Sequence, residues 1–135
     1  METHVITTAI IRNQNKFLIA KRSATKKFAP NQWEFVSGFI DTIESPAETI
    51  IREIKEELGV KGKVIGASDP VDIVDREGKW TIIPFLIELD RQEIQTNSED
   101  HSEAKWVDVE ELNDYPDLKP FLDSEGIQKL LNIKQ

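Results

Sequence analysis

The sequence contains no cysteine. Disulfide bonds, zinc sites with thiolate ligands and cysteine nucleophiles are therefore excluded. It also has no apolar run close to the roughly 18 residues that a membrane-spanning helix needs. Residues 1–4 lack the basic side chains that open a secretory signal peptide. We therefore expect a cytoplasmic protein without a membrane partner.

Positive charge is scarce as well. There are 17 Lys and Arg residues against 25 Asp and Glu residues, which gives a net charge of −8. Binding to a nucleic-acid polymer depends on Lys and Arg displacing counterions from phosphates, so we expect no such polymer as a partner. A small phosphate ligand then needs local help, which divalent cations held by carboxylates provide.

The remaining composition is that of a folded protein. Hydrophobic residues make up 39% of the chain and charged residues 31%, which is too apolar for a disordered chain. A chain of 135 residues fits one domain, residues 1–135, because cores divide only beyond roughly 250 residues.

Short segments rich in β-branched and aromatic residues predict strands on both sides of one strong helix. The first two flank a polar turn at residues 13–15 and predict a hairpin, and a loop follows at residues 23–31. Pro84 predicts an edge strand or a bulge. Ser124 precedes a closing amphipathic helix. This order predicts an α/β sandwich. The predicted strands are residues 5–11, 17–21, 33–36, 64–67, 71–74, 81–89 and 105–107.

The central helix has clear limits. Ser45 is a good N-cap, Pro46 suits the first helical position, and Glu48 completes a Ser-x-x-Glu capping box. Gly59 is a typical C-terminal stop. The sequence therefore predicts a helix from Pro46 to the residue before Gly59.

Three carboxylates crowd this helix. Apolar residues form a buried stripe, which leaves Glu53, Glu56 and Glu57 together on a different face. Like charges about 6 Å apart repel by roughly 3 kcal/mol at an effective dielectric constant near 20, and the helix dipole disfavours anions in the last turn. Hard oxygen ligands with excess negative charge suit Mg²⁺ or Mn²⁺. The stripe consists of Ala47, Ile50, Ile51, Ile54 and Leu58.

The same helix allows a simpler interpretation. Glu48, Arg52 and Glu56 are spaced four residues apart and could form a ladder of salt bridges on a solvated face. Such pairs contribute only tenths of a kcal/mol each, so that interpretation assigns the carboxylates no function.

A longer pattern favours function. Residues 38–60 read GFIDTIESPAETIIREIKEELGV and match G-x5-E-x7-R-E-U-x-E-E-x-G-U, with U aliphatic, at every defined position. This resembles the Nudix hydrolase family. The match covers 23 residues, and weaker likeness runs from the first strand through residues 20–22 and 33–35 to residues 101–107. The resemblance implies an α/β/α sandwich with a mixed β-sheet, and cleavage of a nucleoside diphosphate linked to another group.

The resemblance also implies a metal site for Mg²⁺, with Mn²⁺ as a possible substitute. Glu56 and Glu57 would bind the metal directly, and Glu53 would either bind it or accept a proton from the attacking water. The carbonyl of Ser37 would be a further ligand. Gly38 would allow the backbone to approach the site closely.

The same resemblance implies supporting roles for other charged residues. Arg52 would orient the glutamates, and Glu44 would support the loop through Arg52. Arg22 would meet the substrate phosphates, with Lys26 and Lys27 nearby.

A further carboxylate in this family often comes from a loop outside the pattern. Glu99, Asp100 and Glu103 lie in the corresponding region before Trp106, and we choose Glu99 as the additional metal ligand. An acidic loop exposed to solvent is the alternative. His101 is more typical of a hydrogen-bonding loop residue than of a base.

Residues 33–35 look like those of the antimutator MutT enzymes, which convert nucleoside triphosphates, including oxidised dGTP, into monophosphate and pyrophosphate. Residues 36–37, Phe39 and 118–120 differ from that pattern, so specificity for oxidised guanine is not expected. Residues 75–78 lack the proline and tyrosine of ADP-ribose and diadenosine polyphosphate enzymes. We therefore expect a small nucleoside triphosphate as substrate. ADP-ribose or another dinucleotide is the alternative, and a non-catalytic nucleotide-binding domain is the second alternative.

Overall fold

A computed structural model describes residues 1–40 and 43–134 of the chain. None of the helices in those residues is long and apolar enough to cross a membrane. The strands are β1 (Thr3–Asn13), β2 (Lys16–Arg22), β3 (Trp33–Glu34), β4 (Val36–Phe39), β5 (Gly62–Ala67), β6 (Val71–Asp75), β7 (Gly78–Leu89) and β8 (His101–Asp108). The helices are α1 (Pro46–Leu58), α2 (Lys119–Leu122) and α3 (Glu125–Leu131), with 3-10 turns η1 (Glu110–Asp114) and η2 (Pro116–Leu118).

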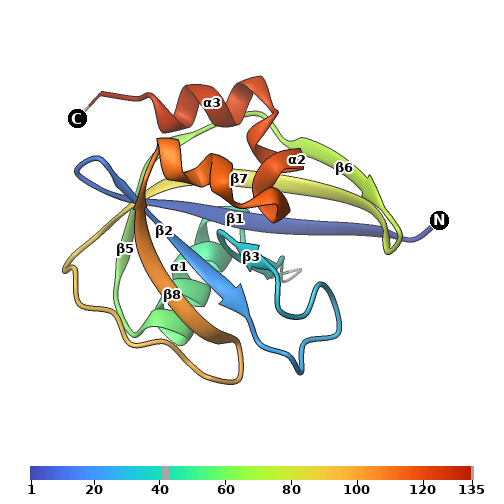
Figure 1. Cartoon of the computed structure of the whole chain (residues 1–135), viewed down its shortest axis with the longest axis horizontal. Helices are drawn as coiled ribbons and strands as arrows, with labels where there is room; N and C mark the ends of the chain where they lie inside the picture. The colour runs from blue at the N-terminus through green and yellow to red at the C-terminus, as the bar shows by residue number, and fades with distance from the viewer. Residues whose placement is uncertain (41–42, 135) are drawn as a thin grey trace.

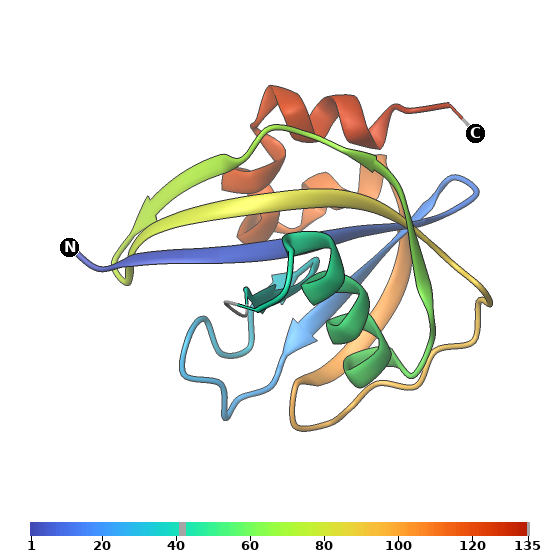
Figure 2. The ribbon, with the colours of Figure 1, turned by 180° about the vertical axis from the view of Figure 1, so that it is seen from behind.

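The strands form a mixed sheet between two layers of helices. β1 pairs in parallel with β7 and antiparallel with β2 and β4, while β5 and β6 pair antiparallel with β7. Helix α1 covers one face of the sheet, and α2 and α3 cover the other (Figures 1 and 2). The predicted α/β/α sandwich with a mixed sheet is confirmed.

Alternating side chains of the central strands explain the three layers. Ala9 and Ile11 of β1 pack in the cluster that contains α1, whereas Ile10 packs in the cluster beneath α3. β2 divides Leu18 and Ile19 between the same two clusters. Burying an isoleucine or leucine side chain contributes about 1.5–3 kcal/mol, so both helical layers are held by apolar contacts.

The predicted hairpin is confirmed, because β1 and β2 pair antiparallel across Gln14 and Asn15. The single strand predicted at residues 33–36 is wrong in one respect. It is divided at Phe35 into β3, which pairs with β2, and β4, which pairs with β1. Phe35 is only 2% exposed and packs against Phe121. The change of partner strand brings Glu34 and residues 37–39 of β4 to one cavity.

The prediction that Pro84 marks an edge strand or a bulge is wrong, and the register shift between β5 and β7 lies at Val64–Gly66 of β5 instead. β7 lies inside the sheet, with β1 on one side and both β5 and β6 on the other. On that second side, pairing with β6 ends at Ile82 and pairing with β5 resumes at Phe85. Proline is tolerated in this central strand because it lies in the gap between two successive partners.

The limits predicted for α1 are confirmed. The hydroxyl of Ser45 accepts from the backbone N–H of Glu48 at 3.2 Å, and the Glu48 carboxylate accepts from the Ser45 N–H at 3.0 Å. Gly59 ends the helix with a φ of 72°, where a side chain would be strained. The capping residues at both ends thus set the limits of α1 and, with them, the helical turn in which each glutamate lies.

Candidate active site

A cavity of about 870 Å³ opens where α1, the end of β4 and the β6–β7 hairpin converge. Its charged lining comes from segments that are far apart in the sequence. Helix α1 contributes Glu53 and Glu57, so two of the three carboxylates predicted on one face of the helix reach the cavity, and Glu56 does not line it. The charged lining residues used below are Arg22, Lys26, Glu34, Glu53, Glu57 and Asp100.

Glu57 is the most deeply placed of these carboxylates. It is 6% exposed, and its Oε2 atom has no hydrogen-bond partner among residues 1–40 and 43–134. Burial is the main reason that the pKa of Glu57 rises to about 9. Nearby carboxylates of Glu53, Glu34 and Asp100 raise this pKa as well, and Lys26 opposes them.

Glu53 lies one helical turn before Glu57 and faces the same cavity. Burial raises its pKa, although the charge of Arg52 acts in the opposite direction. The backbone of Gly38 lies directly against this side chain. A Cβ atom built on Gly38 would be 2.5 Å from Cγ of Glu53, closer than any stable contact. Glycine at this position therefore allows β4 and α1 to approach each other.

Arg52 binds three carboxylates. Its Nε donates to both oxygens of Glu44 at 3.0 Å, and its Nη1 donates to Glu53 at 3.3 Å and to Glu56 at 3.1 Å. The hydrogen bonds to Glu44, and next those to Glu56, raise the pKa of Arg52. Glu56 is exposed and pairs with Arg52. Glu48 instead accepts from the backbone of Ser45, so only the Arg52–Glu56 part of the salt-bridge ladder forms.

A second network surrounds Glu34. Arg22 donates through Nη1 to both oxygens of Glu34 at 3.1 Å, and through Nε to the carbonyl of Phe28 at 2.9 Å. His101 is 1% exposed, and its Nε2 lies 2.8 Å from the Glu34 carboxylate. His101 is therefore a buried hydrogen-bonding residue at the start of β8, as its position in the sequence suggested.

The loop before β8 presents Asp100 to the cavity. Asp100 accepts from Nζ of Lys26 at 2.7 Å, and its charge raises the pKa values of both Glu53 and Glu57. Glu99, which we chose from the sequence, is exposed and does not line the cavity in the described residues. Residues 97–100 form a turn in which the backbone N–H groups of Asp100 and His101 donate to the carbonyl of Asn97 at 2.9 Å. This turn presents Asp100, and not Glu99, to the cavity.

Ser37 lines the cavity within β4. Its hydroxyl donates to the carbonyl of Phe35 at 2.9 Å and lies 2.7 Å from the hydroxyl of Thr8. These bonds fix the backbone beside Gly38. A role for the Ser37 carbonyl as a metal ligand stays a prediction.

The donor set fits a hard divalent cation. Among the described residues, no three carboxylate or imidazole side chains already converge as a complete metal site. Glu53 and Glu56 are instead engaged by Arg52. Yet the buried, unpaired oxygen of Glu57 has carboxylates as neighbours, and the group holds its proton up to a pKa of about 9. A bound cation would allow this carboxyl to ionise.

The raised pKa of Glu57 predicts how the metal-free protein responds to pH. The folded chain holds this proton up to a pKa of about 9, compared with an ordinary value of 4.5. The stabilisation from the protonated carboxyl is complete below 4.5 and is lost as the pH rises through 9. In EDTA we expect the melting temperature to fall between about pH 6 and pH 9. A Glu57→Gln variant should show a clearly shallower fall, and equal slopes would contradict this assignment.

Sequence reasoning gave no role to Glu34, although it noted the Trp-Glu-Phe segment. Its neighbours could have indicated a role, because a carboxylate between two aromatic residues in a short strand is unusual unless a hydrogen-bonding partner satisfies it. Its partners, Arg22 and His101, come from two other strands and could not be identified from local spacing.

The sequence of this chain is similar to those of known proteins. The chain matches the NUDIX domain over residues 2–125. It is 27% identical to an RNA pyrophosphohydrolase of Pelagibacter ubique (strain HTCC1062), over 91% of this chain and 89% of that protein. It is 30% identical to a CTP pyrophosphohydrolase of Escherichia coli (strain K12), over 82% of this chain and 80% of that one.

Solved structures show the same fold. The crystal structure of the MutT protein from Methanosarcina mazei Go1 superposes with a TM-score of 0.72 and 22% identity, and the match covers 96% of this chain and 90% of that one. Because the NUDIX domain matches nearly the whole chain, the chain is a member of the Nudix family, a pyrophosphohydrolase that acts on phosphoanhydride bonds of nucleotides.

Proposed function

We propose that this Nudix enzyme hydrolyses a (deoxy)nucleoside triphosphate to a nucleoside monophosphate and pyrophosphate, with Mg²⁺ as the metal and Mn²⁺ as a possible substitute. The observation that carries the proposal is the buried, unpaired carboxylate oxygen of Glu57 beside Glu53 in a nucleotide-sized cavity. Nudix hydrolases use divalent metal ions, and a cation at the buried oxygen of Glu57 would balance the charge of this group of carboxylates.

We assign the metal to carboxylates from two segments. Glu57 and Glu56 of α1 supply oxygen ligands, with the carbonyl of Ser37. Asp100 replaces Glu99 as the loop carboxylate, because Asp100 lines the cavity with Glu57 and Glu99 does not. Bound Mg²⁺ supplies charge neutralisation on the phosphate oxygens and lowers the pKa of a coordinated water.

Glu53 is the group that we assign to proton acceptance from the attacking water. Its pKa is raised by burial, which makes it a stronger base than an exposed glutamate. Arg52 holds the carboxylate from one side at 3.3 Å, and Glu44 holds Arg52 in turn. Arg52 and Glu44 are therefore positioning residues, since neither lines the cavity in the described residues.

Basic side chains at the rim of this cluster are placed to meet phosphates. Arg22 and Lys26 both line the cavity, and each is neutralised by one carboxylate, Glu34 and Asp100 respectively. A polyphosphate would give each cation a second anionic partner. The phosphate role that the sequence predicted for Arg22 is therefore geometrically possible through its remaining donors.

The choice of substrate class depends on the relatives and on residues 75–78. One relative is named for CTP and another for RNA, and both names describe pyrophosphohydrolases. Residues 75–78 lack the proline and tyrosine associated with ADP-ribose and diadenosine polyphosphate enzymes. A free nucleoside triphosphate remains our leading substrate. The net charge of −8 weighs against a nucleic-acid polymer.

The test is product analysis of the purified protein with Mg²⁺ and a panel of substrates. The panel contains the dNTPs and NTPs, oxidised dGTP, ADP-ribose and an RNA with a 5′-triphosphate. Monophosphate plus pyrophosphate from free nucleotides would support the proposal. AMP and ribose phosphate from ADP-ribose alone would favour the dinucleotide alternative. Metal-dependent binding without any turnover would favour a non-catalytic domain.

Replacing the two adjacent loop carboxylates separately tests the assignment of Asp100. We expect Asp100→Asn to lower kcat/KM on the order of 10- to 100-fold and to raise the Mg²⁺ concentration for half-maximal activity. Glu99→Gln removes the same charge one residue away and should change both by less than about 2-fold, because its side chain is exposed. If the two variants exchanged these effects, Glu99 would be the ligand.

A further inference from the structure

The cavity is divided into two chemically different ends. The acidic end contains Glu53 and Glu57. The other end is lined by the rings of Phe28, Phe39 and Trp80, which come from the loop after β2, the end of β4 and β7. We propose that these three residues, the aromatic wall, stack against the nucleobase of the substrate and read its flat face. This inference rests on the proposed nucleotide hydrolysis.

The aromatic wall is assembled in a fixed arrangement. The rings of Phe28 and Trp80 meet edge to face at 5.2 Å, and those of Phe28 and Phe39 lie 6.0 Å apart. His4 stacks on Trp80 at 4.2 Å. The indole N–H of Trp80 donates to Asp75 at 3.0 Å. The position of the Trp80 ring is thus determined before any ligand binds.

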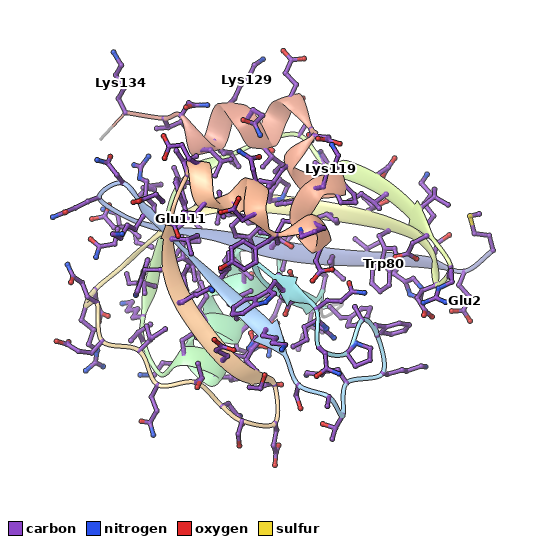
Figure 3. The ribbon with its side chains drawn as sticks, in the orientation of Figure 1. Glu2, Trp80, Glu111, Lys119, Lys129 and Lys134 are labelled. Carbon is purple, nitrogen blue, oxygen red and sulfur yellow. The ribbon has the colours of Figure 1, made fainter. Side chains whose placement is uncertain are left out.

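Strand pairing sets the distance between the carboxylates and Trp80, the ring of the aromatic wall that lies farthest along β1, since Phe39 pairs with Ile6. Thr8 of β1 pairs with Ser37 beside the carboxylates, whereas His4 of the same strand pairs with Trp80. Four residues of extended strand span about 13 Å. A ribose with a short phosphate chain bridges such a separation. Figure 3 places Trp80 beside Glu2 at the N-terminal end of β1, away from α1, which agrees with this measure along the strand.

Exposure of the aromatic wall also indicates a ligand. Phe39 is 51% exposed, and the neighbouring cavity residue Val74 is 62% exposed. Large apolar side chains gathered at a cavity mouth are costly in water unless a partner covers them. A planar base would cover the ring faces while the phosphates occupy the acidic end. One nucleotide would therefore bind at both ends of the cavity.

The chemistry of the aromatic wall predicts tolerance of different bases. The only polar ring atom of Trp80 is already bonded to Asp75, and phenylalanine rings have none. The rings of the aromatic wall therefore offer faces and no hydrogen bonds to a base edge; the polar residues that line the cavity beside Trp80 are Asp75, Arg76 and Glu77 of the β6–β7 hairpin. Stacking of this kind accepts every base and favours purines modestly, because their rings are larger.

Binding of AMP and of ribose 5-phosphate, each with Mg²⁺, tests the inference by calorimetry without requiring turnover. In the wild type we expect AMP to bind roughly 5- to 100-fold more tightly than ribose 5-phosphate, since a stacked base contributes that factor. Trp80→Leu and Phe39→Ser should each reduce this ratio several-fold. Trp106→Leu, an equal truncation outside the lining of this cavity, should leave it unchanged.

The outcomes separate this inference from the proposed hydrolysis. A wild-type ratio near one, or a ratio unchanged in both wall variants, would overturn the aromatic wall as a base site. If Trp80→Leu failed to fold, Phe39→Ser would still decide, because Phe39 is half exposed and contributes little to the core. Preferential AMP binding through the wall in a protein that hydrolyses no nucleotide would uphold the inference and reject the hydrolysis.

Discussion

Glu57→Gln should lower kcat on the order of 10³-fold while leaving the protein folded. The substitution keeps the shape of the side chain but removes the negative charge that a cation needs. In the absence of metal the variant should be at least as stable as the wild type near neutral pH, because burying the Glu57 carboxyl there requires it to take up a proton, which the amide does not. Single-turnover kinetics and thermal unfolding in EDTA measure the two effects.

The same variant separates metal binding from catalysis. Mg²⁺ at about 100 times its dissociation constant should stabilise the wild type by about 2.7 kcal/mol, and Glu57→Gln should lose most of that gain. Glu93→Gln is the matched control, since Glu93 is exposed in the loop after β7. A Glu57→Gln protein with normal Mg²⁺ stabilisation and normal turnover would remove Glu57 from the metal site.

Gly38→Ala is expected to reduce kcat by about 100-fold or more, through displacement of Glu53. The new methyl group would lie 2.5 Å from Cγ and 2.7 Å from Cδ of Glu53, so the side chain or the backbone must shift. Overpacking of this kind also destabilises the fold by about 1–3 kcal/mol. Denaturant unfolding and steady-state kinetics provide the measurements.

A double-mutant cycle shows whether the steric contact is the cause. In a Glu53→Ala background the clashing atoms are absent, so Gly38→Ala should cost much less stability than it does in the wild type. Gly126→Ala is the comparison, because its added methyl group would lie 3.2 Å or more from every neighbouring atom, the nearest being Oγ of Ser68. An equal stability loss in both backgrounds would point to the backbone of Gly38 instead of Glu53.

Local chemistry explains why much of the fold could be predicted. Ser45, Glu48 and Gly59 act on hydrogen bonds within their own helix, so their roles are the same wherever α1 packs. Alternation along β1 and β2 likewise depends only on strand geometry. The partners of each strand are not local, which is why the division of residues 33–36 and the central position of Pro84 were mistaken.

The site shows the same limit. The pattern predicted three carboxylates on one patch, and α1 does carry them. Their environments differ because packing decides which side of the patch is buried: Glu57 lies inside, Glu53 is partly covered, and Glu56 is exposed beside Arg52. Asp100 was considered from the sequence but not chosen, because spacing alone cannot distinguish it from its neighbour.

The gap at Pro84 has a consequence for how such an enzyme can change over evolutionary time. Helix α1 packs against β1, β4 and β5, whereas Trp80 belongs to the hairpin of β6 and β7 on the other side of the gap. Mutations in that hairpin act on the part of β7 that pairs with β6, which is not the part that pairs with β5. Natural selection can therefore alter which nucleotide is preferred while the hydrolytic helix keeps its support.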